Sequence, residues 1–205
     1  MASTDELHIS IKGKGGHAAL PHKYNNPLLA AAKLITDLDE SFQKEKDRPS
    51  VLAIGFIEGL GATNIIPEQV KLKGTLRAMD EEFRKNAHQQ MLKISNDIAQ
   101  SYNLEIDFDI RKGYPCLVND EDLTKKSIAF AKEYMGDENV IDLPIRMTAE
   151  DFAYYSHEVP SCFYRLGTAN ASKGITHGLH TSLFNIDEQS LKIGMGLMAY
   201  LAIKN

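Results

Sequence analysis

Apolar and polar residues alternate in three segments of the first 117 residues, which is the pattern of a strand with one buried face. These segments are 7–12, 70–76 and 104–110. A fourth segment, 51–57, is apolar almost throughout and favours a strand in the centre of a sheet. The pattern therefore predicts four strands in this part of the chain.

Two amphipathic segments separate these strands. The first begins at Pro27, which suits the first turn of a helix, and we expect the charged stretch 43–49 to end it. The second follows Asp80, a residue type that caps helix N-termini. The order strand–helix–strand–strand–helix–strand predicts a ferredoxin-like α+β fold, an open antiparallel sheet with two helices on one face. Because such a sheet has open edges, we expect a homodimer.

The pattern changes after residue 117. It predicts helices over 120–136, 150–156 and 186–203, and short buried strands over 140–143 and 162–166. Helices and short apolar strands in this order are typical of the edge of a larger α/β sheet. Two short strands give this half of the chain a thin core by itself. We therefore expect residues 118–205 to need a partner for their apolar side chains.

Composition and charge exclude several classes of protein. The 205 residues carry a net charge of −5 and no dense run of Lys and Arg, which argues against nucleic-acid binding. Apolar stretches are shorter than a membrane span, and the first residues lack the apolar core of a secretory signal. The two cysteines form no Cys-x-x-Cys motif. We expect a cytoplasmic protein with reduced thiols and no membrane partner.

Three glycines precede His17 in the segment Lys-Gly-Lys-Gly-Gly-His. Glycine residues at 13, 15 and 16 permit backbone conformations that are closed to other residues. Two interpretations follow from these residues alone. The segment is either a tight turn that carries a solvated imidazole, or a backbone that approaches another part of the structure closely in order to place His17.

Two polar residues of the first half also bear on function. Asn64 lies in the loop between two predicted strands, where an asparagine either initiates a turn or contacts a ligand. Arg77 ends a predicted strand. Its planar guanidinium could hold a carboxylate, or it could form a surface salt bridge with Asp80 or Glu81.

The second half contains two further candidates. Glu150 and Asp151 are adjacent carboxylates at a predicted helix start, where acidic side chains are also favourable for the helix dipole alone. His177 and His180 lie three residues apart in a predicted loop. Imidazoles at this spacing can bind a metal ion, but a zinc site needs three or four donors.

Four segments, taken in order, resemble the carboxypeptidase-G/aminoacylase metallopeptidase family, in its amidohydrolase branch with hippurate and auxin-conjugate hydrolases. They are IKGKGGHAALPH at 11–22, TNIIPEQVKLKGTLRAMDEE at 63–82, EDFAYYSHEVPSCFYRLG at 150–167 and LHTSLFNIDE at 179–188. The resemblance covers the chain but only the later half of a typical member. We therefore expect part of a longer protein or a split gene product.

The resemblance implies a fold, a reaction and a cofactor. Residues 7–117 would be a ferredoxin-like lid that dimerises, and residues 118–205 the C-terminal part of a catalytic α/β domain. Family members hydrolyse the amide bond of N-acyl amino acids or small peptides with two divalent ions such as zinc, manganese or cobalt. Most of their metal ligands precede the part that this chain matches. We therefore expect the chain alone to be inactive and to bind no metal specifically.

The resemblance also assigns roles to three polar residues. His180 matches a metal-binding histidine. His17 matches a lid histidine that reaches into the partner subunit's site and stabilises the tetrahedral oxyanion. Asn64 matches a lid asparagine near the substrate.

The remaining assignments concern the surroundings of the substrate. Arg77 corresponds to a contact with a substrate carboxylate, and Glu150 and Asp151 fall in the family's Glu-Asp-Phe motif. An alternative hypothesis is a non-catalytic dimerisation or binding module derived from the same family.

Overall fold

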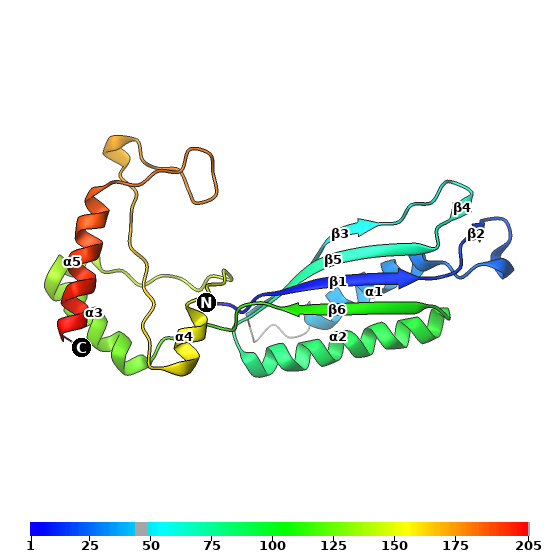
Figure 1. Ribbon diagram of the computed structural model, residues 1–205, viewed down its shortest axis with the longest axis horizontal. Helices are drawn as coiled ribbons and strands as arrows, with labels where there is room; N and C mark the ends of the chain where they lie inside the picture. The colour runs from blue at the N-terminus through cyan, green and yellow to red at the C-terminus, as the bar shows by residue number, and fades with distance from the viewer. Residues whose placement is uncertain (44–48, 205) are drawn as a thin grey trace. The chain divides into compact units, whose positions relative to one another are not determined.

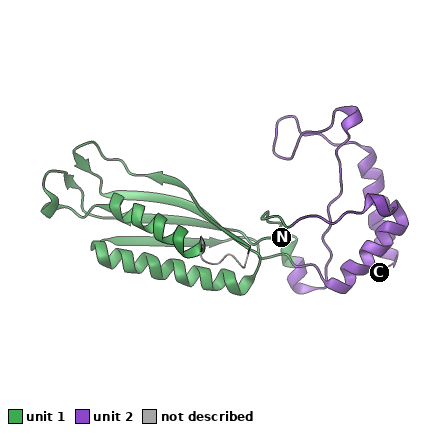
Figure 2. Cartoon of the chain, turned by 180° about the vertical axis from the view of Figure 1, so that it is seen from behind, with its two compact units in different colours: residues 1–117, 145–154 green, residues 118–144, 155–205 purple. Residues whose placement is uncertain are grey.

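A computed structural model of the chain describes residues 1–43 and 49–204. The chain divides into two compact units, which Figure 2 distinguishes by colour. Unit 1 comprises residues 1–117 and 145–154, and unit 2 comprises residues 118–144 and 155–205.

Unit 1 contains a four-stranded antiparallel sheet with two helices on one of its faces (Figure 1). The strands are β1 (Asp5–Lys12), β3 (Ser50–Glu58), β5 (Gln69–Ala78) and β6 (Glu105–Lys112), in the order β3-β5-β1-β6. The helices α1 (Pro27–Gln43) and α2 (Glu81–Tyr102) pack against each other. This arrangement confirms the predicted ferredoxin-like fold. The predicted end of the first helix, at 43–49, falls mostly outside the described residues.

The core of unit 1 lies between the sheet and its helices. Every second residue of β1, from Leu7 to Ile11, points into it and is buried. The strands and helices that meet these side chains contribute Val70, Leu72, Leu76, Leu34, Leu38, Phe83, Met91 and Ile98. The opposite face of β1 carries Glu6, His8, Ser10 and Lys12, so the alternating sequence pattern reports the side of the sheet that the helices cover.

The prediction that 51–57 is a central strand is wrong, because β3 lies at the edge of the sheet. Val51 and Phe56 are each 40% exposed, and Ile57 is 56% exposed. A continuous apolar run predicts burial on both faces. In β3 the helices of unit 1 cover only one face, so the other apolar side chains remain accessible.

A second, two-stranded sheet lies at one end of the main sheet (Figure 1). It pairs β2 (Gly16–His17) with β4 (Ile65–Ile66), and the short helix η1 (Pro21–Lys23) follows β2. We call this part of unit 1, residues 13–25 and 61–68, the tip.

Unit 2 is built from helices and long irregular segments. Its helices are α3 (Glu121–Met135), η2 (Asp137–Asn139), η3 (Ala171–Lys173) and α5 (Gln189–Lys204), while α4 (Ala153–Glu158) begins in unit 1 and ends in unit 2. Helices α3 and α5 pack together, with the rings of Tyr134 and Tyr200 5.4 Å apart. Local signals set the limits of α3, since Asp120 caps its first turn and Gly136 follows its last residue.

The two strands predicted in the second half do not form among the described residues. Segments 140–143 and 162–166 have no strand partner there, and Ile141 and Leu143 are 73% and 48% exposed. An extended segment needs a neighbouring strand to satisfy its backbone groups and cover its apolar side chains. The sequence pattern therefore identified apolar segments for which the described part of unit 2 offers no neighbouring strand.

Candidate functional site

Close backbone contacts at the tip explain two of the three glycines before His17. A Cβ atom on Gly13 would lie 2.4 Å from the carbonyl oxygen of Asn25, and one on Gly15 would lie 2.8 Å from that of Ile66. A Cβ on Gly16 would make ordinary contact with Tyr24, at 3.4 Å. Of the two interpretations of this segment, the structure therefore supports the close approach of two backbone segments.

The same backbone brings His17 and Asn64 together. His17 pairs with Ile65 across the two-stranded sheet, and the next amide, of Ala18, donates a hydrogen bond to the carbonyl oxygen of Asn64 (N–O distance 3.0 Å). A turn then closes through Leu20, whose amide donates to the carbonyl oxygen of His17 at 2.9 Å. The imidazole itself is exposed, and its Nδ1 accepts a hydrogen bond from the amide of Ala19 at 3.1 Å.

Arg77 lies at the opposite end of the main sheet. It belongs to β5, whose first residue, Gln69, is next to the tip, and it pairs with Val51 of β3. Arg77 is eight residue steps from Gln69 along the strand, which corresponds to about 26 Å. The alternative partner from the sequence, Asp80, instead caps α2 by accepting a hydrogen bond from the amide of Phe83 at 2.6 Å. The structure therefore separates Arg77 from His17 and Asn64 within one chain.

The carboxylates Glu150 and Asp151 precede a helix and do not belong to its first turn, because α4 begins only at Ala153. Their segment belongs to unit 1, where the amide of Ala2 donates to the carbonyl oxygen of Thr148 at 3.1 Å. Glu150 also accepts a hydrogen bond from the amide of Asp151 at 3.2 Å.

His180 lies in an exposed loop of unit 2 and has a φ of 62°. A positive φ is uncommon for residues other than glycine and occurs where the surroundings impose it. The base of the loop is anchored by Asp187, which accepts hydrogen bonds from Lys173 at 2.7 Å and from Asn170 at 2.5 Å. These contacts and a backbone hydrogen bond lower the pKa of Asp187 to about 2.

The described residues do not make a metal site by themselves. No group of three or more His, Cys, Asp or Glu side chains among residues 1–43 and 49–204 is arranged to hold an ion. His180 would contribute one donor at most, whereas a zinc site needs three or four. The described part of the chain also has no helix long and apolar enough to cross a bilayer.

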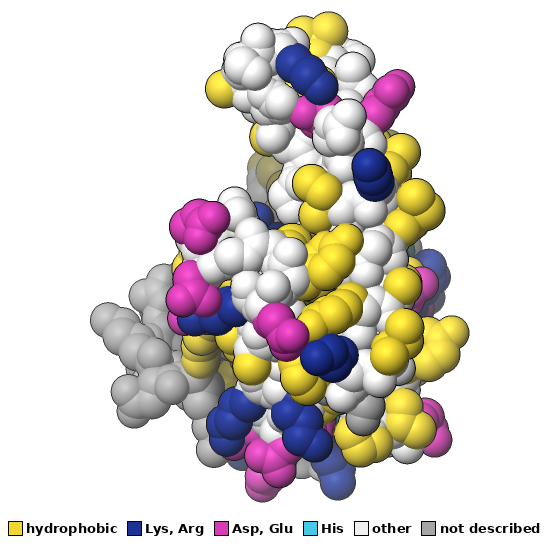
Figure 3. Space-filling model, turned by 90° about the vertical axis from the view of Figure 1, so that its left-hand side faces the viewer, with side chains coloured by type: hydrophobic (Ala, Val, Ile, Leu, Met, Phe, Trp, Pro, Cys, Tyr) yellow, Lys and Arg dark blue, Asp and Glu magenta, His cyan; other side chains and the backbone are white. Residues whose placement is uncertain are grey.

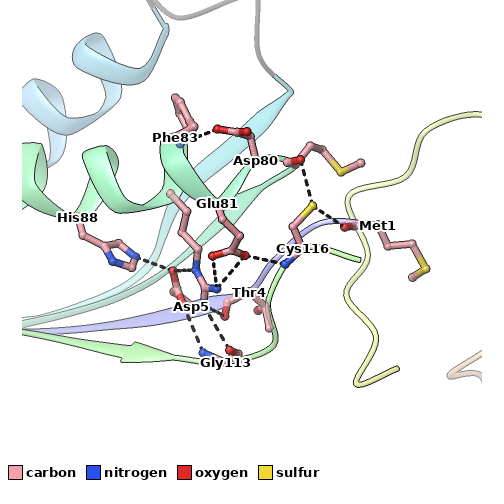
Figure 4. Close-up of polar contacts among 11 residues, drawn as sticks. Met1, Thr4, Asp5, Asp80, Glu81, Phe83, His88, Gly113 and Cys116 are labelled. Carbon is pink, nitrogen blue, oxygen red and sulfur yellow. Dashed lines mark hydrogen bonds and ion pairs between the residues drawn. The ribbon is translucent and has the colours of Figure 1, made fainter. Parts of the chain in front are cut away.

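Unit 1 also contains a buried ionic network that no sequence motif predicts (Figure 4). The carboxylate of Asp5 accepts hydrogen bonds from Arg84 Nε at 2.9 Å and from His88 Nε2 at 2.6 Å. Burial by itself would raise the pKa of Asp5, but the bonds and charges of Arg84 and His88 outweigh it and lower the pKa to about 2. A signal was available, because Asp5 shares the inward-facing positions of β1 with Leu7.

The network connects two strands of the sheet, β1 and β6, to the first turns of α2. Arg84 also binds the carbonyl oxygen of Thr4 at 3.4 Å and that of Gly113 at 3.3 Å. Glu81, one turn before Arg84, accepts a hydrogen bond from the amide of Cys116 at 2.6 Å. The start of β1 and the segment that follows β6 are therefore held at the same helix end.

Comparisons with known proteins agree with this fold. Residues 4–103 match the peptidase dimerisation domain of the M20 family. An N-acetyldiaminopimelate deacetylase of Geobacillus sp. is 33% identical over 99% of this chain and 53% of its own length. The thermostable carboxypeptidase 2 of Saccharolobus solfataricus is 31% identical over 100% of this chain and 52% of its own length.

A solved structure extends the comparison to three dimensions. The crystal structure of the Bacillus subtilis YXEP protein, described as a dinuclear metal-binding peptidase of the M20 family, superposes with a TM-score of 0.74 and 26% identity. It covers 99% of this chain and 50% of the YXEP chain. The chain thus spans about half the length of the curated relatives it matches. Residues 4–103 are therefore an M20 peptidase dimerisation domain, and the chain as a whole is similar to about half of a deacetylase and of a carboxypeptidase.

Proposed function

We propose that the chain is the dimerisation domain and part of the catalytic α/β domain of a metal-dependent amidohydrolase. Residues 7–117 would form the lid and residues 118–205 the catalytic part. The complete enzyme would hydrolyse the amide bond of N-acyl amino acids or small peptides, in line with relatives that are a deacetylase and a carboxypeptidase. The observation that carries this proposal is the tip, where closely packed glycines hold His17 beside Asn64.

In the proposed reaction, His17 donates a hydrogen bond to the carbonyl oxygen of the substrate as that oxygen gains negative charge. Asn64 lies beside the same substrate. Arg77 binds a substrate carboxylate through its planar guanidinium. Since Arg77 and the tip are separated by most of β5, one small substrate cannot contact both in one subunit. We propose that the tip of each subunit serves the site of its partner.

A homodimer of this kind needs an exposed edge on unit 1, and the two edges of the sheet differ. Edge strand β6 alternates Glu105, Asp107, Asp109 and Arg111 on its accessible face, which is how proteins protect an edge from pairing. Edge strand β3 instead exposes the apolar side chains of Val51, Phe56 and Ile57. We propose that the second copy pairs along β3 and the adjacent face of α1, where Leu29 is 58% exposed.

The proposed role of the second half depends on residues from elsewhere. His180 would provide one ligand to a divalent ion, zinc, manganese or cobalt, in the complete enzyme. Glu150 and Asp151 would lie around the substrate. Because a single imidazole cannot hold such an ion, the isolated chain is proposed to be inactive.

The catalytic proposal is tested with a chimera. The half of the Geobacillus deacetylase that this chain does not match is joined to this chain, and hydrolysis of N-acetyl and N-benzoyl amino acids is measured with zinc, manganese or cobalt. We expect turnover by the chimera and none by the chain alone. In the active chimera, His17→Ala should lower kcat about 10²- to 10³-fold without loss of metal. The matched control is His22→Ala, which removes another exposed imidazole of the tip.

Two results would contradict this proposal. Turnover by the purified chain alone would refute its inactivity. A chimera that dimerises and binds metal but does not hydrolyse any amide would favour the alternative, a non-catalytic dimerisation module.

The dimer is tested separately by sedimentation of the purified chain at micromolar concentrations. We expect a dimer that Val51→Asp combined with Phe56→Asp weakens by at least about tenfold in Kd, since the carboxylates would be buried in the interface. The control combines Asp107→Ala with Asp109→Ala on the opposite edge. A wild-type chain that stays monomeric, or equal weakening by both pairs, would contradict the proposal.

A further inference from the structure

Among the residues that the structure describes, the ring of His17 has a hydrogen-bond partner on one nitrogen only. The amide of Ala19 donates to Nδ1 over 3.1 Å, although the ring is otherwise exposed. A neutral imidazole has one nitrogen that donates and one that accepts. Because a backbone amide can only donate, Nδ1 must carry the lone pair in this contact, and the proton of the ring lies on Nε2.

The fold of the tip makes the amide of Ala19 available for this bond. The neighbouring amides already have backbone partners, since Ala18 donates to the carbonyl oxygen of Asn64 and Leu20 to that of His17. The hydroxyl of Tyr24 also stabilises the turn, because it donates a hydrogen bond to the carbonyl oxygen of Ala18 at 3.3 Å. The amide of Ala19, between those of Ala18 and Leu20, therefore points to the ring of His17.

We propose that Ala19 is a positioning residue whose amide fixes His17 as the Nε2–H tautomer, so that the exposed edge of the ring is a hydrogen-bond donor. This inference rests on the proposed function for its catalytic meaning, and it makes that function more specific. A general base or a metal ligand at Nε2 would need a lone pair there. The fixed tautomer instead suits His17 to donate to an oxyanion.

Two other histidines, His8 and His88, differ from His17 in the group that faces the ring. In His88, Nε2 donates to the Asp5 carboxylate, so an acidic side chain sets the tautomer. In His8, Nε2 lies 3.1 Å from a carboxylate oxygen of Glu6. For His17 the partner is the backbone amide of Ala19, which does not titrate and which, among the standard residues at position 19, only proline would remove.

The tautomer can be read directly by NMR on the full chain labelled with ¹⁵N-histidine at alkaline pH. Long-range couplings between ring protons and nitrogens distinguish Nε2–H from Nδ1–H. We expect a single Nε2–H form for His17, and averaged signals for His22, an exposed histidine of the same tip. A Nδ1–H form of His17, or averaging equal to that of His22, would overturn the proposal.

Substitutions at position 19 test the cause of the tautomer. Ala19→Pro removes the amide proton, and the signals of His17 should then move towards the averaged pattern of His22. Ala19→Gly keeps the proton and should leave the tautomer unchanged. If Ala19→Pro retains the cross-strand contact between His17 and Ile65 and a pure Nε2–H form, the amide is not the cause. If Ala19→Pro disturbs that contact, the wild-type and Ala19→Gly spectra still decide the proposal.

These measurements separate the inference from the proposed function, since the tautomer is read without any substrate. A pure Nε2–H tautomer together with full turnover of the His17→Ala chimera would refute the catalytic proposal and leave the role of Ala19 intact. An averaged tautomer together with a large loss of turnover in the His17→Ala chimera would refute the role of Ala19 and support the catalytic proposal.

Discussion

The two units differ most in how they bury apolar side chains. In unit 1, two helices cover one face of a sheet, and side chains such as Leu7, Leu34 and Leu72 are almost fully buried. In unit 2, α3 and α5 pack on each other without a sheet, and Met195, Met198 and Ile203 remain between 65% and 84% exposed. Figure 3 shows apolar side chains gathered over one face of the molecule.

This difference indicates where the stability of the chain comes from. Burial of apolar surface is the main favourable term in folding, and unit 1 obtains it from its own elements. The helices of unit 2 have good local signals, but among the described residues they bury little of their apolar surface. Substitutions in unit 1 should therefore change the free energy of unfolding far more than similar substitutions in unit 2.

The largest expected effect is that of removing the buried cation of unit 1. Arg84→Ala removes the guanidinium from the buried carboxylate of Asp5 and leaves it with the imidazole of His88, which should lower the free energy of unfolding by about 3–5 kcal/mol. Urea titration followed by circular dichroism measures it. The control, Arg111→Ala, removes an exposed arginine bonded to Asp109 at 2.8 Å and should cost less than about 1 kcal/mol. Equal losses would show that the network does not stabilise unit 1.

A matched pair of leucines compares the two units directly. Leu72→Ala creates a cavity in the core of unit 1 and should cost about 2–5 kcal/mol. Leu191→Ala, at a leucine of α5 that is 53% exposed, should change the free energy of unfolding by less than about 0.5 kcal/mol. The same titration measures both. If Leu191→Ala proves as costly as Leu72→Ala, the exposed face of unit 2 is covered in solution.

Signals that act within a few residues were readable from the sequence. The sequence predicts Asp80 as a helix cap and a helix that starts at residue 120, and the alternating pattern of 7–12 predicts the buried face of β1. The same kind of evidence could not give the neighbours of a strand. Segment 51–57 has the composition of a central strand, but its place at the edge is set by the order in which the chain returns to the sheet.

The candidate site shows the same limit. The residue types at His17, Asn64 and Arg77 indicate chemistry. Only the strand register shows that most of β5 lies between Arg77 and the other two residues. The pairing of Asp5 with Arg84 joins residues 79 positions apart, which no local pattern reports. The bond from Ala19 to His17 is short in sequence, yet it depends on how the turn is anchored to Asn64.

Acid should destabilise unit 1 through Asp5. The pKa of this carboxyl, about 2, lies below its ordinary value of 3.8, so its stabilising contribution is complete above pH 4 and is lost as the pH falls towards 2. The loss amounts to about 2 kcal/mol. It is measured as the free energy of unfolding between pH 5 and pH 2, in comparison with Asp5→Asn, which should be less stable at pH 5 and lose less on acidification. Parallel curves for both proteins would exclude Asp5 as the cause.

Unit 2 also contains a carboxyl with a lowered pKa, that of Asp187, whose pKa is about 2. Its partners Lys173 and Asn170 belong to the loop that carries His180. Protonation should therefore loosen that loop without unfolding unit 1. Hydrogen exchange of the amide of Asp187, which donates to Thr168 at 2.9 Å, should accelerate as the pH falls through about 2, beyond the change in intrinsic exchange.

The smallest expected effects are those of the two helix caps, and they test whether the units unfold independently. Asp80 accepts a hydrogen bond from the amide of Phe83 at 2.6 Å, and Asp120 accepts one from that of Leu123 at 2.8 Å. Replacing either aspartate by alanine removes about 1 kcal/mol of helix stability. Asp80→Ala should lower the free energy of unfolding of unit 1 by that amount. Asp120→Ala should instead accelerate hydrogen exchange in the first turn of α3 about fivefold.

Asparagine is the control at both positions, because it also caps helices and should restore most of the loss. The decisive measurement is hydrogen exchange of the core amides of unit 1, such as that of Leu72, in the Asp120→Ala variant. If the exchange of these amides is unchanged, α3 opens without unit 1, as its sparse burial predicts. If they accelerate with those of α3, the two units unfold as one, and the contrast in burial does not translate into a contrast in stability.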